Sequence, residues 1–207
     1  MRTAHVAILC LAFKVILAGS PDAAPQDFRV RLETTKGPMV IQVHRDWAPH
    51  GADRFYELVT ARYFDDNRFL RVHAGQWAQF GINGDPSVST RWRTRTIPDA
   101  PPKQSNVHGT VTFEFAEPNG RATQVYIALT DLSDPQDAQG FVPFGRVIEG
   151  MEIADRLNAE YGENAGSGIR AGKQQPLFDG GNAYLDRAFP RLDRLLRTVV
   201  LPATKTK

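Results

Sequence analysis

Short runs in which apolar and polar residues alternate dominate the chain after residue 26 and predict a mainly β domain. The runs at 28–34 and 38–44 are separated by Lys36-Gly37, which is typical of an antiparallel hairpin. In the run at 109–116, the pattern places Phe113 and Phe115 on one face. Further alternating runs lie at 68–85, 123–129 and 140–150.

Two stretches with helical spacing separate these runs. Phe55, Leu58 and Val59 predict a helix that continues through Arg62, and a second helix is predicted over 151–162. A further set of apolar residues predicts a C-terminal amphipathic helix over 183–199, and the Pro-rich stretch 84–108 reads as a surface loop. Many strands with few helices favour an antiparallel β-barrel or sandwich with helices over its ends.

One apolar stretch carries polar residues inside its pattern. Between residues 68 and 85, alternation places Arg71 on one face of a strand and puts Trp77 and Gln79 together on one face of the next. A cation and amides among apolar side chains need partners if they are buried. The alternative is that Arg71 is an edge-strand residue with its guanidinium in water, as is usual for arginine.

The first 24 residues differ in composition from the rest. Arg2 and His5 precede an apolar run over 6–17, and small residues follow, as in a secretory signal peptide, although Lys14 interrupts the run. The alternative is an N-terminal tail that is disordered or touches a membrane; the run is too short for a comfortable span. Cys10, the single cysteine, lies in this segment, so the protein without it would have no disulfide and no cysteine-based site.

Charge and motifs exclude several classes. The formal net charge of +2 over 207 residues gives no indication of a nucleic-acid partner. Arg91, Arg93 and Arg95 read as a solvated loop rather than a phosphate-binding patch. The histidines have no ligand-like spacing and there is no phosphate-binding glycine loop, so we expect neither a metal nor a cofactor.

Three stretches in order resemble the cyclophilin family of peptidyl-prolyl cis-trans isomerases. They read FLRVHAGQWAQFGINGD, TQVYI and GFVPFGRVIEGMEIADRL, and the opening hairpin with the helix APHGADRFYELV also fits. The resemblance implies a closed antiparallel eight-stranded β-barrel capped by two helices, here with an extra C-terminal helix. The expected organisation is a signal peptide at 1–24, a cyclophilin-like domain at 27–180 and a helical extension at 181–207.

The resemblance also implies the site. Arg71 matches the family's catalytic arginine and Gln79 the glutamine behind it, while Gln124 and Tyr126 match the strand that borders the proline pocket. The remaining expected substrate-binding residues are Gln76, Trp77, Phe115 and Phe141. The departures are Leu70 for a histidine, Ala74 for a proline, Gln76 for a pocket phenylalanine, Phe115 for an asparagine, and DPQDAQG without the loop tryptophan.

Two functions follow from the resemblance. The first is an isomerase acting on Pro-containing polypeptides in a periplasmic, extracellular or secretory compartment. The alternative is a chaperone or binding module with little catalysis, which Gln76 and the missing tryptophan favour. From residue types alone, Gln79 and Gln124 could equally be satisfied strand polar groups. We expect a monomer without a stable membrane span, and cyclosporin-type ligands are further partners that the family implies.

Overall fold

The computed structural model describes residues 23–203 except residue 167, and the expected signal peptide at 1–24 lies almost wholly outside this range. Ala24, its last residue, is buried and donates its backbone N–H to Asp53 Oδ1 at 3.1 Å. None of the helices in the described part is long and apolar enough to cross a bilayer.

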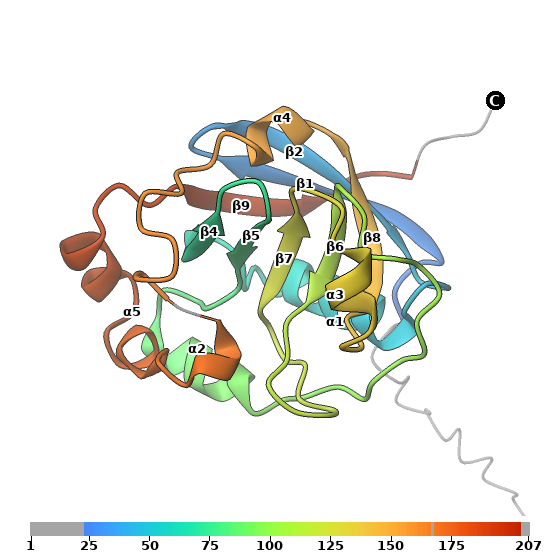
Figure 1. Ribbon diagram of the computed structural model, residues 1–207, viewed down its shortest axis with the longest axis horizontal. Coiled ribbons are helices and arrows are strands. Elements are labelled where there is room, and N and C mark those ends of the chain that lie inside the picture. Colours follow the sequence, from blue (N-terminus) through green and yellow to red (C-terminus); the bar gives the residue numbers. More distant parts are fainter. Residues whose placement is uncertain (1–22, 167, 204–207) are drawn as a thin grey trace, which may run out of the picture.

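A single curled antiparallel sheet organises the domain (Figure 1). Its strand order is β3-β9-β1-β2-β8-β6-β7-β5-β4, so the two strands at its ends, β3 and β4, follow one another in the chain. The resemblance implied eight strands and the sheet has nine, because the chain bends at Phe69-Leu70 and separates β3 from β4. The strands are β1 (Asp27–Thr34), β2 (Gly37–His44), β3 (Asn67–Arg68), β4 (Arg71–His73), β5 (Trp77–Phe80), β6 (Thr110–Phe113), β7 (Val125–Ala128), β8 (Pro143–Glu149) and β9 (Arg194–Val200).

The core lies inside this curled sheet, as the alternation predicted. Val30 and Leu32 of β1 and Ile41 of β2 are fully buried in one apolar cluster. The register of β6 against β8 shifts where Thr112 pairs with Pro143, as is typical of a proline within a strand. Helix α1 (Pro49–Thr60) adds its predicted stripe to the core through Phe55, Leu58 and Val59.

Several predicted helices were wrong in position or extent. The stretch 84–108 contains helix α2 (Pro86–Arg93), which Asp85 caps by accepting from the Ser87 N–H at 2.7 Å. The helix expected over 151–162 is the four-residue α4 (Met151–Ala154), and the polar loop at 130–139 contains α3 (Ser133–Asp137).

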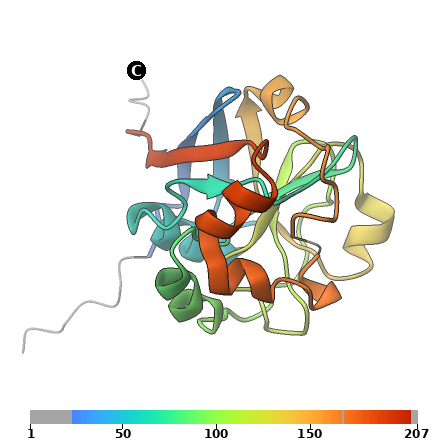
Figure 2. The same cartoon turned by 90° about the vertical axis from the view of Figure 1, so that its left-hand side faces the viewer.

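The C-terminal prediction of one helix over 183–199 was also wrong. Helix α5 (Gln175–Ala188) begins earlier, is interrupted at Gly181, and lies beside α2 (Figure 2). After Pro190 the chain extends into β9, which pairs with both β1 and β3. The residues expected to form a helical extension therefore contribute a strand of the sheet, with Leu195 fully buried in the core.

Candidate functional site

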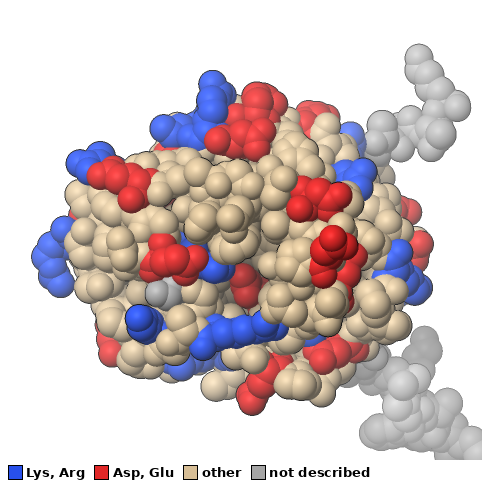
Figure 3. All heavy atoms as spheres, viewed as in Figure 1, with Lys and Arg blue, Asp and Glu red and all other residues tan. Residues whose placement is uncertain are grey.

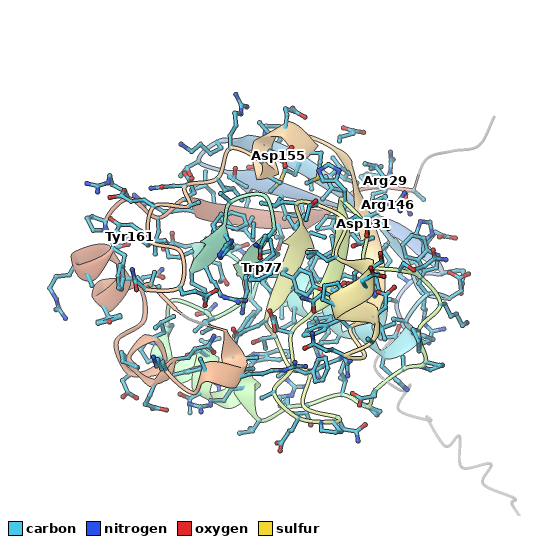
Figure 4. All side chains as sticks on the ribbon, viewed as in Figure 1. Arg29, Trp77, Asp131, Arg146, Asp155 and Tyr161 are labelled. Atoms are coloured by element: carbon cyan, nitrogen blue, oxygen red, sulfur yellow. The ribbon has the colours of Figure 1, made fainter. Side chains whose placement is uncertain are left out.

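Arg71 lies on β4, opposite Gln79 of β5 in the antiparallel register. Its Nη1 donates to Gln79 Oε1 at 3.0 Å, and its guanidinium lies over the Trp77 ring, 4.5 Å from the centroid. The side chain is 13% exposed, so it is not the solvated edge-strand arginine of the alternative reading. Trp77 occupies the middle of the face shown in Figure 4. The strand pairing thus holds a cation against an aromatic face.

A chain of amides fixes the orientation of Gln79. This fully buried side chain donates from Nε2 to Gln124 Oε1 at 2.8 Å. Gln124 in turn donates to Gln174 Oε1 at 2.7 Å and accepts from Gln174 Nε2 at 2.9 Å. Because the NH₂ group of Gln79 is used in this chain, its carbonyl oxygen is the atom that faces Arg71. The amides therefore position the guanidinium, as the resemblance implied for Gln79.

Beside Arg71 lies a small aromatic cluster made of Tyr126, Phe115 and Phe141. The Phe141 ring is 4.7 Å from Phe115 and 5.8 Å from Tyr126, and all three side chains are at least nine-tenths buried. The Tyr126 hydroxyl donates to Asn106 Oδ1 at 2.7 Å, and burial raises the pKa of this hydroxyl. The hydroxyl that distinguishes Tyr126 from the family's phenylalanine is thus tied into the protein, and its ring remains a wall of the cluster.

Two carboxylates also reach Arg71, and sequence reasoning missed both. Glu163 accepts from Nε with its two oxygens at 2.7 and 2.9 Å, and Glu114 lies 3.4 Å from Nη1. Burial raises the pKa of Glu114 to about 7, a shift opposed by the nearby Arg71 and Arg170 and reinforced by Glu163. In Figure 3, acidic and basic side chains meet around a hollow near the middle of this face.

A pocket of about 150 Å³ opens between the arginine and the aromatic cluster. Its lining includes Arg71, Glu114 and Phe141, together with residues 168–170 from the stretch before α5. A second hollow of about 260 Å³ adjoins it and shares Glu114 and Ile169. The site is therefore a shallow charged groove with an aromatic wall, of the size that admits one or two side chains.

The structure brings together most residues predicted for the site. Arg71, Gln79, Gln124 and Trp77 form one connected set, and Tyr126, Phe115 and Phe141 form the adjoining cluster. Gln76 lies in the turn between β4 and β5, where its backbone N–H donates to the His73 carbonyl and its carbonyl accepts from the Leu129 N–H.

The face predicted for Phe115 was wrong. Phe113 packs in the main core and Phe115 in the aromatic cluster, because β6 ends at Phe113. One signal for the missed Glu114 was present: a carboxylate stands between two phenylalanines in a strand pattern.

Comparison with known proteins gives a consistent match. Residues 29–176 match the family model described as cyclophilin type peptidyl-prolyl cis-trans isomerase/CLD. The chain is 27% identical over 152 residues to peptidyl-prolyl cis-trans isomerase A of Dickeya dadantii, covering 70% of this chain and 78% of that protein. It is 30% identical over 134 residues to peptidyl-prolyl cis-trans isomerase-like 1 of Rhizopus delemar, covering 62% of this chain and 78% of that protein. The isomerase-like 4 protein of Cryptococcus neoformans is longer: 27% identity over 155 residues covers 66% of this chain and 31% of that protein.

Solved structures share the fold. A cyclophilin type peptidyl-prolyl cis-trans isomerase of Cryptosporidium parvum superposes with a TM-score of 0.60 at 16% identity, covering 86% of this chain and 99% of that one. A second crystal structure of that protein was obtained in the presence of the dipeptide Ala-Pro. It gives a TM-score of 0.59 at 17% identity and covers 84% of this chain and 99% of that one. At these identities the likeness concerns the fold.

Proposed function

Because the chain belongs to the cyclophilin-type peptidyl-prolyl cis-trans isomerase family, we propose that it accelerates rotation about X-Pro peptide bonds in polypeptides. The observation that carries the proposal is the guanidinium of Arg71, oriented by Gln79 and placed beside the aromatic cluster. The Ala-Pro dipeptide used with the Cryptosporidium relative supports a proline-containing substrate here.

The reaction needs preferential binding of a twisted amide. An X-Pro bond keeps a barrier of about 18–20 kcal/mol because rotation breaks amide resonance, and no covalent bond is made. As resonance is lost, the lone pair of the prolyl nitrogen localises and becomes a hydrogen-bond acceptor. A guanidinium has five N–H donors, so Arg71 can keep Gln79 and still donate to that nitrogen. A donor that is already oriented stabilises the transition state more than the planar ground state.

The aromatic cluster has a separate task in this proposal. Phe115 and Phe141, with the ring of Tyr126, provide apolar surface on which a prolyl ring sheds water. Gln124 accepts a hydrogen bond from Gln79, and its amide is the group proposed to bond the substrate backbone.

The test compares isomerisation of an X-Pro peptide by wild type, Arg71→Ala and Arg71→Lys. We expect Arg71→Ala to lower kcat/KM by about 10²-fold, the usual effect of removing one oriented donor. Lysine keeps the charge without the rigid fork and should recover only part of the activity. Arg31→Ala, at an exposed position of β1, is the matched control, and thermal unfolding verifies that each variant is folded. Equal rates for wild type and Arg71→Ala would end the catalytic proposal and favour binding without catalysis.

We further infer that the protein is exported and acts as a monomer. The apolar run at 6–17, preceded by a basic start and followed by small residues, supports export. The N-terminal residue of the mature protein, determined by mass spectrometry, tests this, since a protein that retains Met1 contradicts cleavage. Sedimentation equilibrium tests the monomer, and competition with a cyclosporin-type ligand tests whether the groove accepts one.

A further inference from the structure

The stretch Gly168–Gln174, called the strap below, lies directly against the site. Gly168 is so close to Arg71 that a Cβ on it would stand 3.4 Å from the guanidinium carbon. Ile169 and Arg170 line the pocket beside Arg71, and Gln174 is bonded to Gln124 from the other end. In Figure 1 this orange stretch leads into α5 on the face that carries β4 and β5. The groove is therefore occupied at several points by the protein's own chain.

Arg170 occupies the aromatic part of the groove. Its guanidinium lies over Phe115 at 4.7 Å and Phe141 at 4.9 Å from the ring centroids. Its Nε donates to the Phe115 carbonyl at 3.1 Å, and Nη1 donates to Gln139 Oε1. These are the surfaces that a prolyl segment would have to contact, so a substrate and Arg170 compete for them.

Each contact of Arg170 with the aromatic rings is nevertheless weak. The side chain is exposed, and an exposed cation–aromatic contact changes an equilibrium by about two- to fivefold. A second cation, Arg121, lies 4.1 Å over the same Phe115 ring, and the two like charges repel, as the lowered pKa of Arg121 reflects after the effect of burial. Displacing Arg170 therefore costs the two ring contacts and the bonds to Phe115 and Gln139, and it relieves the repulsion from Arg121.

Charge determines what can replace Arg170. Glu114 is 8% exposed and borders both hollows. Its neighbouring cations are Arg71 and Arg170, and Arg71 also pairs with Glu163. If Arg170 moved away, a buried carboxylate would lose one of its two cations. A segment that brings its own positive charge restores the balance, and an uncharged or acidic segment does not.

We propose that the strap is an intramolecular occupant of the substrate groove, an inference that rests on the proposed function. Glu114 then selects polypeptides with Lys or Arg within two residues of the proline. Arg170 then takes the place of the substrate's cation. The free protein is partly self-inhibited, and basic Pro-containing segments release it.

The test uses labelled peptides with Lys, norleucine or Glu at either of the two positions before a proline, measured both by anisotropy and by isomerisation rate. We expect wild type to favour the Lys peptide over the norleucine peptide about fivefold. Glu114→Gln should remove that preference. Arg170→Ala should strengthen binding of the norleucine peptide about fivefold, whereas Arg146→Ala, an exposed arginine on β8, should change nothing.

The outcomes separate the two proposals. Binding with the expected preferences but without isomerisation would overturn the proposed catalysis and support the strap. Isomerisation with equal preference for all three peptides, or a preference that survives Glu114→Gln, would overturn the inference. So would unchanged or weaker binding in Arg170→Ala, including failure of wild type and Arg170→Ala to bind any of the peptides.

Discussion

The buried carboxylate of Glu114 should make the stability of this protein depend on pH in an unusual direction. Burial raises its pKa from 4.5 to about 7, although Arg71 and Arg170 oppose the shift. The folded protein therefore binds this proton more tightly than the unfolded chain does. The corresponding contribution to the free energy of unfolding is complete below about pH 4.5 and is lost as the pH rises through about 7.

The magnitude follows from the difference between the two pKa values. At about 1.36 kcal/mol per pH unit, the gap between 4.5 and about 7 amounts to about 3 kcal/mol. Glu114→Gln keeps the shape of the protonated side chain and cannot ionise. Relative to wild type, the variant should therefore gain about 3 kcal/mol of unfolding free energy between pH 4.5 and pH 8.

Urea unfolding of wild type and Glu114→Gln at several pH values between 4.5 and 8 measures this difference. Glu160→Gln is the matched control, because pairing with Arg191 lowers the pKa of Glu160. Its stabilising contribution is present above its ordinary pKa and is lost only below it, so the difference between Glu160→Gln and wild type should stay constant between pH 4.5 and pH 8. A flat difference for Glu114→Gln would mean that Arg71 holds the ionised carboxylate at no cost, and the reasoning would fail.

Three further predictions concern the supports of the site. Gln79→Leu removes the acceptor that orients Arg71, so kcat should fall more than tenfold in the isomerisation assay while thermal unfolding still shows a folded protein. Gly81→Ala should lower the free energy of unfolding in urea by at least about 3 kcal/mol, because φ is +115° and the new Cβ would lie 2.3 Å from the Thr123 carbonyl oxygen. The control Gly140→Ala, with φ +82° and open space around the new Cβ, should lower it by about 1 kcal/mol. Asp186→Asn weakens the pair with Arg68, whose side chain is 2% exposed and has little access to water in exchange. We expect a loss of about 2 kcal/mol by urea unfolding, and no loss would indicate that Asp66 suffices.

Local patterns predicted the elements in which one face alone is buried. The alternation in β1 and β2 and the stripe of α1 identify those elements, because their buried residues repeat with the period of the backbone. Helix α2 was missed although Asp85 and Pro86 are a regular N-cap and first residue, because its exposed, polar sequence resembles a loop. At the C-terminus, apolar residues before and after Pro190 have a joint spacing that imitates one helix, and pairing with β1 determines instead that the second half is a strand.

The site was predictable only where it is local in sequence. Alternation alone indicates that Trp77 and Gln79 share a face, and the short turn before them brings Arg71 of the preceding strand opposite Gln79. Glu163 and Arg170 reach the same place from a Gly-rich polar stretch about a hundred residues later, and nothing in their local pattern predicts a contact. The assignment of Gln76 to the pocket rests on correspondence with the family alone and stays a prediction.

The position of the strap follows from the topology of the sheet. Strand β9 pairs between β1 and β3, so the chain that leaves β8 must return to the far side of the sheet to complete it. The connection from α4 to α5, residues 155–174, is much longer than most links between elements. Its polar and charged residues need partners, and the charged groove beside β4 offers them: Glu163 to Arg71, and Gln174 to Gln124. Occupation of the groove thus contributes to ordering this connection. In the proposed displacement of Arg170, the connection loses only part of this order. Gln174 and α5 stay anchored, and only the exposed end of the strap moves.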